Sequence, residues 1–251
     1  MLNNIQIAFF DLDGTLTNNK KIISKENIDA LKKLKDKNIK IVFCSGRWDS
    51  YIEKYNENLN LVDYIISDNG SCIKDLNSNK IIYEESLNKY LIDEIINYCS
   101  LNGLELIFNS SNKRYYNFTS INSKIYQAVI ICKSKEEIDK IIKYINNNKY
   151  LKLSYISLSY YNDIKKDKYT VNINLKQTSK GNSCKYLLNY LNIPKNNSIC
   201  FGDNDNDIDM FNNCGIRIAM KNGLDKLKDS ADYITLSNEE NGVAFFINKN
   251  L

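Results

Sequence analysis

An apolar run that ends in two carboxylates constrains this chain more than any other stretch. Residues 5–10 are apolar apart from Gln6, and Asp11-Leu12-Asp13-Gly14-Thr15 follows directly. A short apolar run that stops at a turn signal is typical of a buried parallel strand. Ligands bind beyond the carboxyl ends of such strands, which is where this sequence puts Asp11 and Asp13. Two carboxylates so close repel each other unless a cation or a proton joins them, although an ordinary Asp-Gly turn would account for the same residues.

The residue totals exclude several classes of partner. The chain has 251 residues, with 34 basic and 30 acidic side chains and a net charge of +4. This balance, without a dense basic segment, argues against a nucleic-acid partner. No apolar run approaches the length of a membrane span and the N-terminus does not resemble a signal peptide, so we expect no membrane partner. The 7 cysteines form no Cys-x-x-Cys pair, which favours a reducing, cytoplasmic location.

The complete absence of histidine removes whole mechanisms. A Ser-His-Asp triad, a Cys-His dyad and a zinc site built on histidine are all impossible. Acid–base chemistry near neutral pH must therefore use Asp, Glu, Lys, Tyr or Cys.

Three later stretches place polar residues at other predicted element ends. The apolar residues 39–44 stop at Ser45-Gly46-Arg47, where a hydroxyl and backbone amides could hold an anion, although a plain strand-end turn is the commoner explanation. Lys180-Gly181 opens a predicted helix, and residues 198–201 predict a strand that runs into Gly202-Asp203 and then Asn204-Asp205-Asn206-Asp207. Parallel strands would bring these ends to one edge of a sheet.

The pattern of elements changes between residues 85 and 175. In the last strand of this stretch, polar residues alternate with Val171, Ile173 and Leu175, which is typical of an antiparallel sheet with one face in water; the polar residues are Thr170, Asn172 and Asn174. We therefore predict an α/β core domain from residues 1–84 and 176–251, with an α+β domain from residues 85–175 inserted into it.

In this order, the four stretches resemble the motifs of the haloacid dehalogenase-like (HAD) phosphatase superfamily. The insertion between the second and third motifs is similar to that of the type IIB, Cof-like subfamily, as are Asp68-Asn69-Gly70 and Asn241-Gly242-Val243-Ala244. The resemblance covers nearly the whole chain and implies a Rossmann-like parallel-sheet core with an inserted α+β cap domain of type C2B. Ser45 stands where threonine is usual, and Asn204 where glycine or serine is usual.

The resemblance also implies catalytic roles. Asp11 would attack phosphorus and form an aspartyl-phosphate, while Asp13 would protonate the leaving oxygen and then activate water. The implied phosphate contacts are the Leu12 and Gly46 amides, Ser45, Lys180 and Asn206, of which Ser45 and Lys180 would also stabilise the transition state.

The acidic residues of the motifs imply a metal ion. Asp11, Asp13, Asp203 and Asp207 would converge, which a bound cation makes tolerable, and oxygen ligands beside a phosphate favour Mg²⁺. By analogy, Asp11, the backbone carbonyl of Asp13 and Asp203 would ligate the ion, with Asn204 close by. Asp207 completes the expected metal site, more by orienting Lys180 or a metal-bound water than as a direct ligand.

The predicted function is a Mg²⁺-dependent phosphatase of small phosphorylated metabolites, acting as a monomer or homodimer. Two alternatives remain: a phosphomutase of the phosphomannomutase type, which shares the first motif, and a non-catalytic metabolite-binding protein. The insert is expected to cover the strand ends as a lid and to favour hexose phosphates or a phosphorylated cofactor. One or two of its aromatic residues could stack on a sugar or heterocycle: Tyr115, Tyr116, Phe118, Tyr155, Tyr160, Tyr161 and Tyr169.

Overall fold

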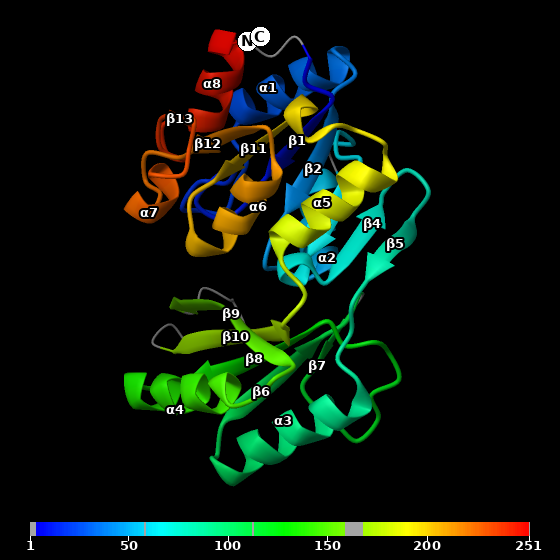
Figure 1. Ribbon diagram of the computed structural model, residues 1–251, viewed down its shortest axis with the longest axis vertical. Helices are drawn as coiled ribbons and strands as arrows, with labels where there is room; N and C mark the ends of the chain where they lie inside the picture. Colours follow the sequence, from blue (N-terminus) through cyan, green and yellow to red (C-terminus); the bar gives the residue numbers. More distant parts are fainter. Residues whose placement is uncertain (1–3, 58, 112, 159–167, 251) are drawn as a thin grey trace. The chain divides into compact units, whose positions relative to one another are not determined.

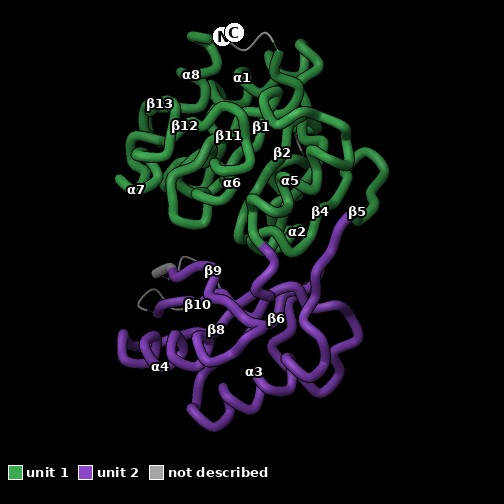
Figure 2. Tube along the Cα trace, viewed as in Figure 1, with its two compact units in different colours: residues 1–82, 179–251 green, residues 83–178 purple. Residues whose placement is uncertain are grey.

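The computed structural model describes residues 4–57, 59–111, 113–158 and 168–250 (Figure 1). The chain divides into two compact units: unit 1 comprises residues 1–82 and 179–251, and unit 2 comprises residues 83–178 (Figure 2). Each unit has its own sheet and its own apolar core. No helix in the described ranges is long and apolar enough to cross a membrane.

Unit 1 is organised around one eight-stranded sheet. Its strands are β1 (Ile7–Phe10), β2 (Lys40–Cys44), β3 (Tyr64–Ser67), β4 (Cys72–Asp75), β5 (Lys80–Glu84), β11 (Ser198–Gly202), β12 (Ile216–Ala219) and β13 (Tyr233–Ile234). They lie in the order β13-β12-β11-β1-β2-β3-β4-β5, and the pairs from β13 to β3 are parallel, whereas β4 runs antiparallel to β3. The carboxyl ends of β1, β2, β3 and β11 therefore meet at one edge of the sheet.

Helices cover both faces of this sheet. They are α1 (Lys25–Asp36), α2 (Asp49–Asn56), α5 (Lys180–Tyr190), α6 (Ile208–Asn213), α7 (Asp225–Lys228) and α8 (Gly242–Asn250). Alternate strand residues such as Ala8 and Phe10 join α1 and α8 in one apolar cluster, and Phe10 stacks on Phe201 with 5.1 Å between ring centroids. Helices α5 and α6 pack against each other, and α5 also contacts β3 and β4. Both faces of β1 are thus buried, which explains its uninterrupted apolar sequence.

Unit 2 is a five-stranded sheet with two helices. Its elements are α3 (Lys89–Leu101), β6 (Glu105–Asn109), β7 (Arg114–Tyr115), β8 (Gln127–Cys132), α4 (Lys135–Asn146), β9 (Leu151–Leu158) and β10 (Tyr169–Leu175). The strand order is β7-β6-β8-β10-β9 and every pair is antiparallel. Apolar residues of α3 and α4, such as Ile95 and Ile141, pack with alternate strand residues such as Phe108 and Ile130 in the main core, and the intervening strand residues form a smaller buried cluster.

The polar residues of β10 are buried, so the expectation that they face water is wrong. Thr170 and Asn174 are 0% exposed, and Asn172 is 3% exposed. Gln127 connects the carboxamides: its Oε1 accepts from Asn109 at 3.0 Å and from Asn172 at 3.2 Å, and its Nε2 donates to Asn174 at 3.2 Å. Because a carboxamide both donates and accepts, these side chains pair with one another, and only Asn172 Oδ1 among them is left without a hydrogen-bond partner in the described part of the chain.

The aromatic residues of the insert differ in how deeply they are buried. Tyr115, Phe118 and Tyr169 pack with the apolar core of unit 2, and Tyr155 is half-buried. Tyr116 is exposed. Tyr160 and Tyr161 lie outside the described residues. Tyr115 is buried, whereas Phe118 and Tyr169 are only partly buried against this core, so stacking of an aromatic residue on a ligand stays a prediction.

Candidate active site

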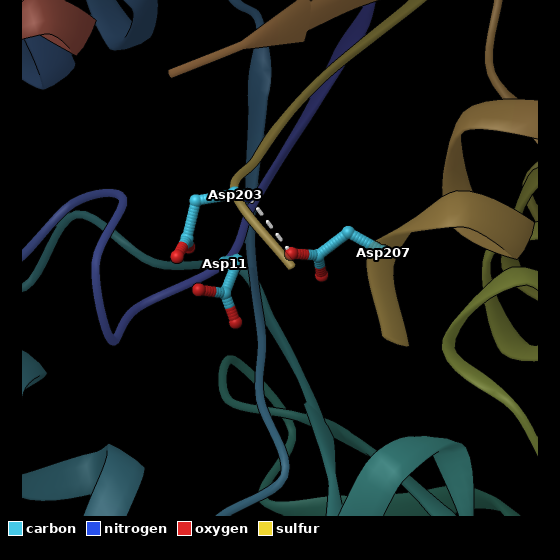
Figure 3. Close-up of side chains that lie close together, drawn as sticks. All are labelled: Asp11, Asp203 and Asp207. Carbon is cyan, nitrogen blue, oxygen red and sulfur yellow. Dashed lines mark hydrogen bonds between the residues drawn. The ribbon is translucent and has the colours of Figure 1, made fainter. Parts of the chain in front are cut away.

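Three carboxylates meet at the edge where the parallel strands of unit 1 end. Asp11 directly follows β1, Asp203 directly follows β11, and Asp207 ends the 3₁₀ turn Asp205–Asp207. One oxygen of each lies within 4.8 Å of the others, and all three side chains are buried (Figure 3). This grouping follows from the parallel pairing of β1 and β11, which brings the carboxyl ends of both strands to the same edge of the sheet.

One ammonium group lies within this acidic cluster. Lys180 is 1% exposed, and its Nζ donates to Asp11 Oδ1 and to Asp207 Oδ1, both at 2.6 Å. Burial acts to lower the pKa of Lys180, but the two carboxylates outweigh it and raise the pKa well above its usual value. Burial and the neighbouring carboxylates of Asp207 and Asp203 outweigh Lys180 and raise the pKa of Asp11 well above its usual value.

Asp203 completes the cluster under tight steric constraint. Thr15 Oγ1 donates to Asp203 Oδ1 at 2.7 Å. Gly14 has φ +89°, and a Cβ there would lie 2.4 Å from Asp203 Oδ2, so only glycine lets the loop approach so closely. Burial and the Asp207 carboxylate raise the pKa of Asp203 to about 7. The Asp-x-Asp-Gly-Thr stretch thus supports Asp203 as well as contributing its own carboxylates.

Both oxygens of Asp207 are engaged by donors. Oδ1 accepts from Lys180, and Oδ2 accepts from the amides of Asp203 at 3.0 Å and Asn204 at 3.1 Å. Asn204 in turn accepts the Asp205 amide through its side chain at 2.8 Å. Asp207 therefore positions Lys180 and fixes the loop that carries Asp203.

Asp13 departs from the expected convergence of four carboxylates. Arg47 donates to both of its oxygens, from Nε at 2.8 Å and from Nη2 at 3.1 Å, and Lys21 Nζ lies 2.7 Å from Oδ1. Burial acts to raise the pKa of Asp13, but these two cations outweigh it and leave the pKa below its usual value. Its carboxylate is compensated by cations of the chain itself and so needs no shared metal ion.

The remaining predicted residues lie at the ends of β1 and β2 and in the turn after β11. Leu12 and Ser45 are each 1% exposed, and Ser45 Oγ accepts the Arg47 amide at 3.2 Å. A Cβ on Gly46 would lie 2.9 Å from Asn69 Oδ1, and this same oxygen accepts from Asn206 Nδ2 at 3.1 Å. Asn69 thus links the second motif to Asn206 of the fourth.

Known proteins resemble this chain in sequence over nearly its whole length. The family model described as haloacid dehalogenase-like hydrolase matches residues 8–247. The chain belongs to the HAD-like hydrolase family. YxeH of Bacillus subtilis (strain 168), named as a candidate phosphatase, is 32% identical to this HAD-like hydrolase over 97% of each chain. YwtE of the same organism, named as a 5-amino-6-(5-phospho-D-ribitylamino)uracil phosphatase, is 27% identical and aligns with 95% of this chain and 96% of its own.

Solved structures share the fold of this HAD-like hydrolase. The crystal structure of a haloacid dehalogenase-like hydrolase from Bacteroides thetaiotaomicron superposes with a TM-score of 0.85 at 23% identity, covering 98% of this chain and 100% of that one. The predicted family, the α/β fold with a mainly parallel core sheet and the phosphatase class are therefore confirmed. The roles of individual residues remain predictions.

Sequence reasoning missed four residues that shape the site of this HAD-like hydrolase. Thr15 supports Asp203, Arg47 and Lys21 pair with Asp13, and Asn69 connects Gly46 with Asn206. The position of Arg47 directly after Ser45-Gly46, at the end of a predicted strand, could have marked it as a site residue. Asn69 appeared only within the Asp68-Asn69-Gly70 resemblance, which gave it no role, and nothing in the sequence marked Lys21 as a partner of Asp13.

Proposed function

We propose that this HAD-like hydrolase is a Mg²⁺-dependent phosphatase of small phosphorylated metabolites that works through an aspartyl-phosphate on Asp11. The observation that carries the proposal is the buried cluster of three carboxylates with Lys180 between two of them. A nucleophilic carboxylate, a cation fixed beside it and a site for a second cation are what phosphoryl transfer requires.

The donor set fits a magnesium ion. Asp11, Asp203 and Asp207 carry more negative charge than the single ammonium of Lys180 neutralises, and all three are buried. Asp11 and Asp203 would hold the ion, and we retain the Asp13 carbonyl and Asn204 as further oxygen donors, whereas Asp207 is occupied by its own donors. Oxygen ligands of this kind suit Mg²⁺. The bound ion would supply charge neutralisation to the phosphoryl oxygens.

The reaction uses two carboxylates in turn. Asp11 attacks phosphorus, and the bond to the ester oxygen breaks while Asp13 donates its proton to that oxygen. Asp13 then removes a proton from water, which attacks the aspartyl-phosphate, releases inorganic phosphate and restores Asp11. Because Arg47 and Lys21 favour the ionised form of Asp13, these contacts must loosen or be shared with substrate before Asp13 can carry a proton.

The phosphoryl oxygens are held by groups from separate segments. Ser45 Oγ accepts from the Arg47 amide, so its own hydroxyl proton can be donated to a phosphate oxygen. The Leu12 and Gly46 amides, Lys180 and Asn206 complete the set. Held oxygens and fixed charges lower the barrier because they need not reorganise during the reaction.

We further propose that residues 85–175 act as a cap domain that selects a small, hydroxylated leaving group. The name of YwtE describes a phosphate on a ribityl chain joined to a heterocycle, a substrate of this chemical kind. We therefore favour phosphorylated polyols, sugars and cofactor precursors.

The deciding experiment measures phosphate release from a panel of such esters, with and without Mg²⁺. Turnover that needs Mg²⁺ and produces inorganic phosphate is expected. Hydrolysis that persists undiminished in a strong chelator, or the absence of hydrolysis with every ester, would contradict the proposal.

A further inference from the structure

One residue between the predicted phosphate contacts has a donor with no hydrogen-bond partner. Asn69 is 2% exposed, and its Nδ2 is buried without a partner among the described residues. Its other end is occupied, because Oδ1 accepts from Asn206 Nδ2 at 3.1 Å. Buried side-chain amides nearly always have partners, so an orphaned one calls for an explanation.

The backbone around Asn69 is held in an unfavourable conformation. Asp68, Asn69 and Gly70 have φ values of +49°, +55° and +96°, so three consecutive residues occupy the left-handed region. Asn and Asp enter this region more often than other non-glycine residues, but usually as single residues, and such a run persists where the surrounding structure enforces it, often at functional sites. Two backbone hydrogen bonds enforce it here: the Asp68 amide to the Arg47 carbonyl at 2.8 Å and the Asn69 amide to the Ser45 carbonyl at 3.1 Å.

The same turn packs against the start of α5. A Cβ on Gly70 would lie 2.1 Å from the Ser179 carbonyl oxygen and 2.8 Å from the Lys180 nitrogen, and Ser183 Oγ donates to the Gly70 carbonyl at 2.6 Å. The Asn69 carboxamide itself lies against Gly46, whose added Cβ would be 3.1 Å from Asn69 Nδ2. The turn that carries Asn69 is therefore fixed between the second motif and the start of the helix that carries Lys180.

We propose that Asn69 is an additional phosphate-binding residue, whose Nδ2 donates a hydrogen bond to a non-ester oxygen of the substrate phosphoryl group. The inference rests on the proposed function and adds a donor to it. A phosphate oxygen only accepts, which matches a carboxamide whose acceptor is already occupied by Asn206. The absent side chain of Gly46 is what lets this amide lie beside the Ser45-Gly46 backbone.

The test compares inhibition by inorganic phosphate in variants assayed with an activated aryl phosphate. Asn69→Gly removes the carboxamide and tolerates the left-handed backbone, and Asn79→Gly is a matched control at φ +56° on an exposed turn. We expect the inhibition constant for phosphate to rise roughly 10- to 100-fold in Asn69→Gly, as for a lost hydrogen bond to a charged group. Asn79→Gly should match the wild type.

A second pair of variants separates direct contact from an effect through Asn206. If Asn69 donates to phosphate itself, Asn69→Gly also weakens phosphate inhibition in an Asn206→Ala background. Asn69→Asp keeps the shape and the acceptor for Asn206 but presents an anionic oxygen, so it should weaken phosphate at least as much. Circular dichroism verifies that each variant is folded, and Asn69→Asp carries the test if Asn69→Gly does not fold.

Three outcomes would overturn the inference. Wild-type phosphate inhibition in a folded Asn69→Gly or Asn69→Asp variant would show that the amide serves only the turn. An effect that vanishes in the Asn206→Ala background would make Asn69 a positioning residue. A wild-type protein that hydrolyses no phosphate ester would contradict the proposed function as well, whereas the first two outcomes leave that function standing.

Discussion

Arg47 holds the carboxylate of Asp13 through two parallel hydrogen bonds of 2.8 and 3.1 Å. Its guanidinium also lies over the Tyr51 ring, with 4.6 Å from Cζ to the ring centroid, and this contact restricts rotation of the guanidinium away from Asp13. The proposed general acid is therefore held in its ionised form by a fixed cation, with Lys21 as a second and more exposed one.

Removing Lys21 should extend activity to higher pH. The pKa of Asp13 is lowered by its cations, so Lys21→Met raises it and the proton-donating form survives to higher pH. We expect the alkaline limb of kcat/KM to move up by about half a pH unit, as for a partly exposed ion pair. The exposed neighbour offers the control Lys20→Met, which should leave the limb in place. A downward shift in Lys21→Met would contradict the role of Asp13 as the acid.

Asp11→Asn should abolish turnover without unfolding the protein. The change removes the nucleophile but keeps the volume, and it relieves repulsion from Asp203 and Asp207 while weakening the pair with Lys180. We expect a loss of several decades in phosphate release, each worth about 1.4 kcal/mol of barrier. The free energy of unfolding should change by only about 1 kcal/mol. Near-normal phosphate release would exclude Asp11 as the nucleophile.

Asp207→Asn should destabilise the fold, because both oxygens of this carboxylate accept hydrogen bonds. An asparagine amide would have to face Lys180 or the amides of Asp203 and Asn204, leaving a buried donor unpaired. We expect a loss of about 3 kcal/mol in urea unfolding of the metal-free protein. Asp205→Asn, an exposed neighbour in the same turn, should change stability by less than about 0.5 kcal/mol. Equal effects would show that the Asp207 contacts contribute little.

Metal affinity should depend more on Asp203 than on Asp13. The Asp203 side chain belongs to the buried cluster, whereas the Asp13 side chain is paired with Arg47 and would offer the ion only its backbone carbonyl. Calorimetric titration with Mg²⁺ should therefore show a larger loss of affinity for Asp203→Asn than for Asp13→Asn. The reverse order would reject this ligand assignment.

Replacing the insert with a short linker should remove substrate preference before it removes hydrolysis. Unit 1 has its own core, so it can fold without the insert. The Ile82 carbonyl accepts from Tyr186 in α5 at 3.0 Å, so the last residue of unit 1 before the insert contacts the helix that follows the insert, and a short linker can join them. We expect a shortened protein that still hydrolyses an activated aryl phosphate but no longer distinguishes a sugar phosphate from a phosphorylated cofactor. An unchanged preference would assign specificity to unit 1.

The sequence was most informative where a local pattern and a general rule of sheet geometry coincide. Asp11, Ser45 and Asp203 each follow an apolar run, and parallel strands bring such ends together, so their proximity could be predicted. The pairing of Asp13 with Arg47 could not, because it joins two loops 34 positions apart by side-chain orientation alone.

The polar residues of unit 2 show a different limit. Alternation in β10 correctly separates two faces of a strand, but it does not reveal whether the polar face meets water or other polar side chains. Asn172 and Asn174 pair through Gln127, a residue on the neighbouring strand β8. Burial of a polar face depends on the register between strands, which a single strand does not encode.

The buried cysteines of the two units can report how often each unit opens locally. All seven cysteines are buried and free, with Cys99 and Cys132 in unit 2 and the other five in unit 1. A thiol reagent can modify them only when the surrounding structure opens, so the modification rate of each peptide reports how often its own unit opens. Mass spectrometry of labelled peptides would therefore reveal whether the two units unfold together or one before the other, without any engineered reporter.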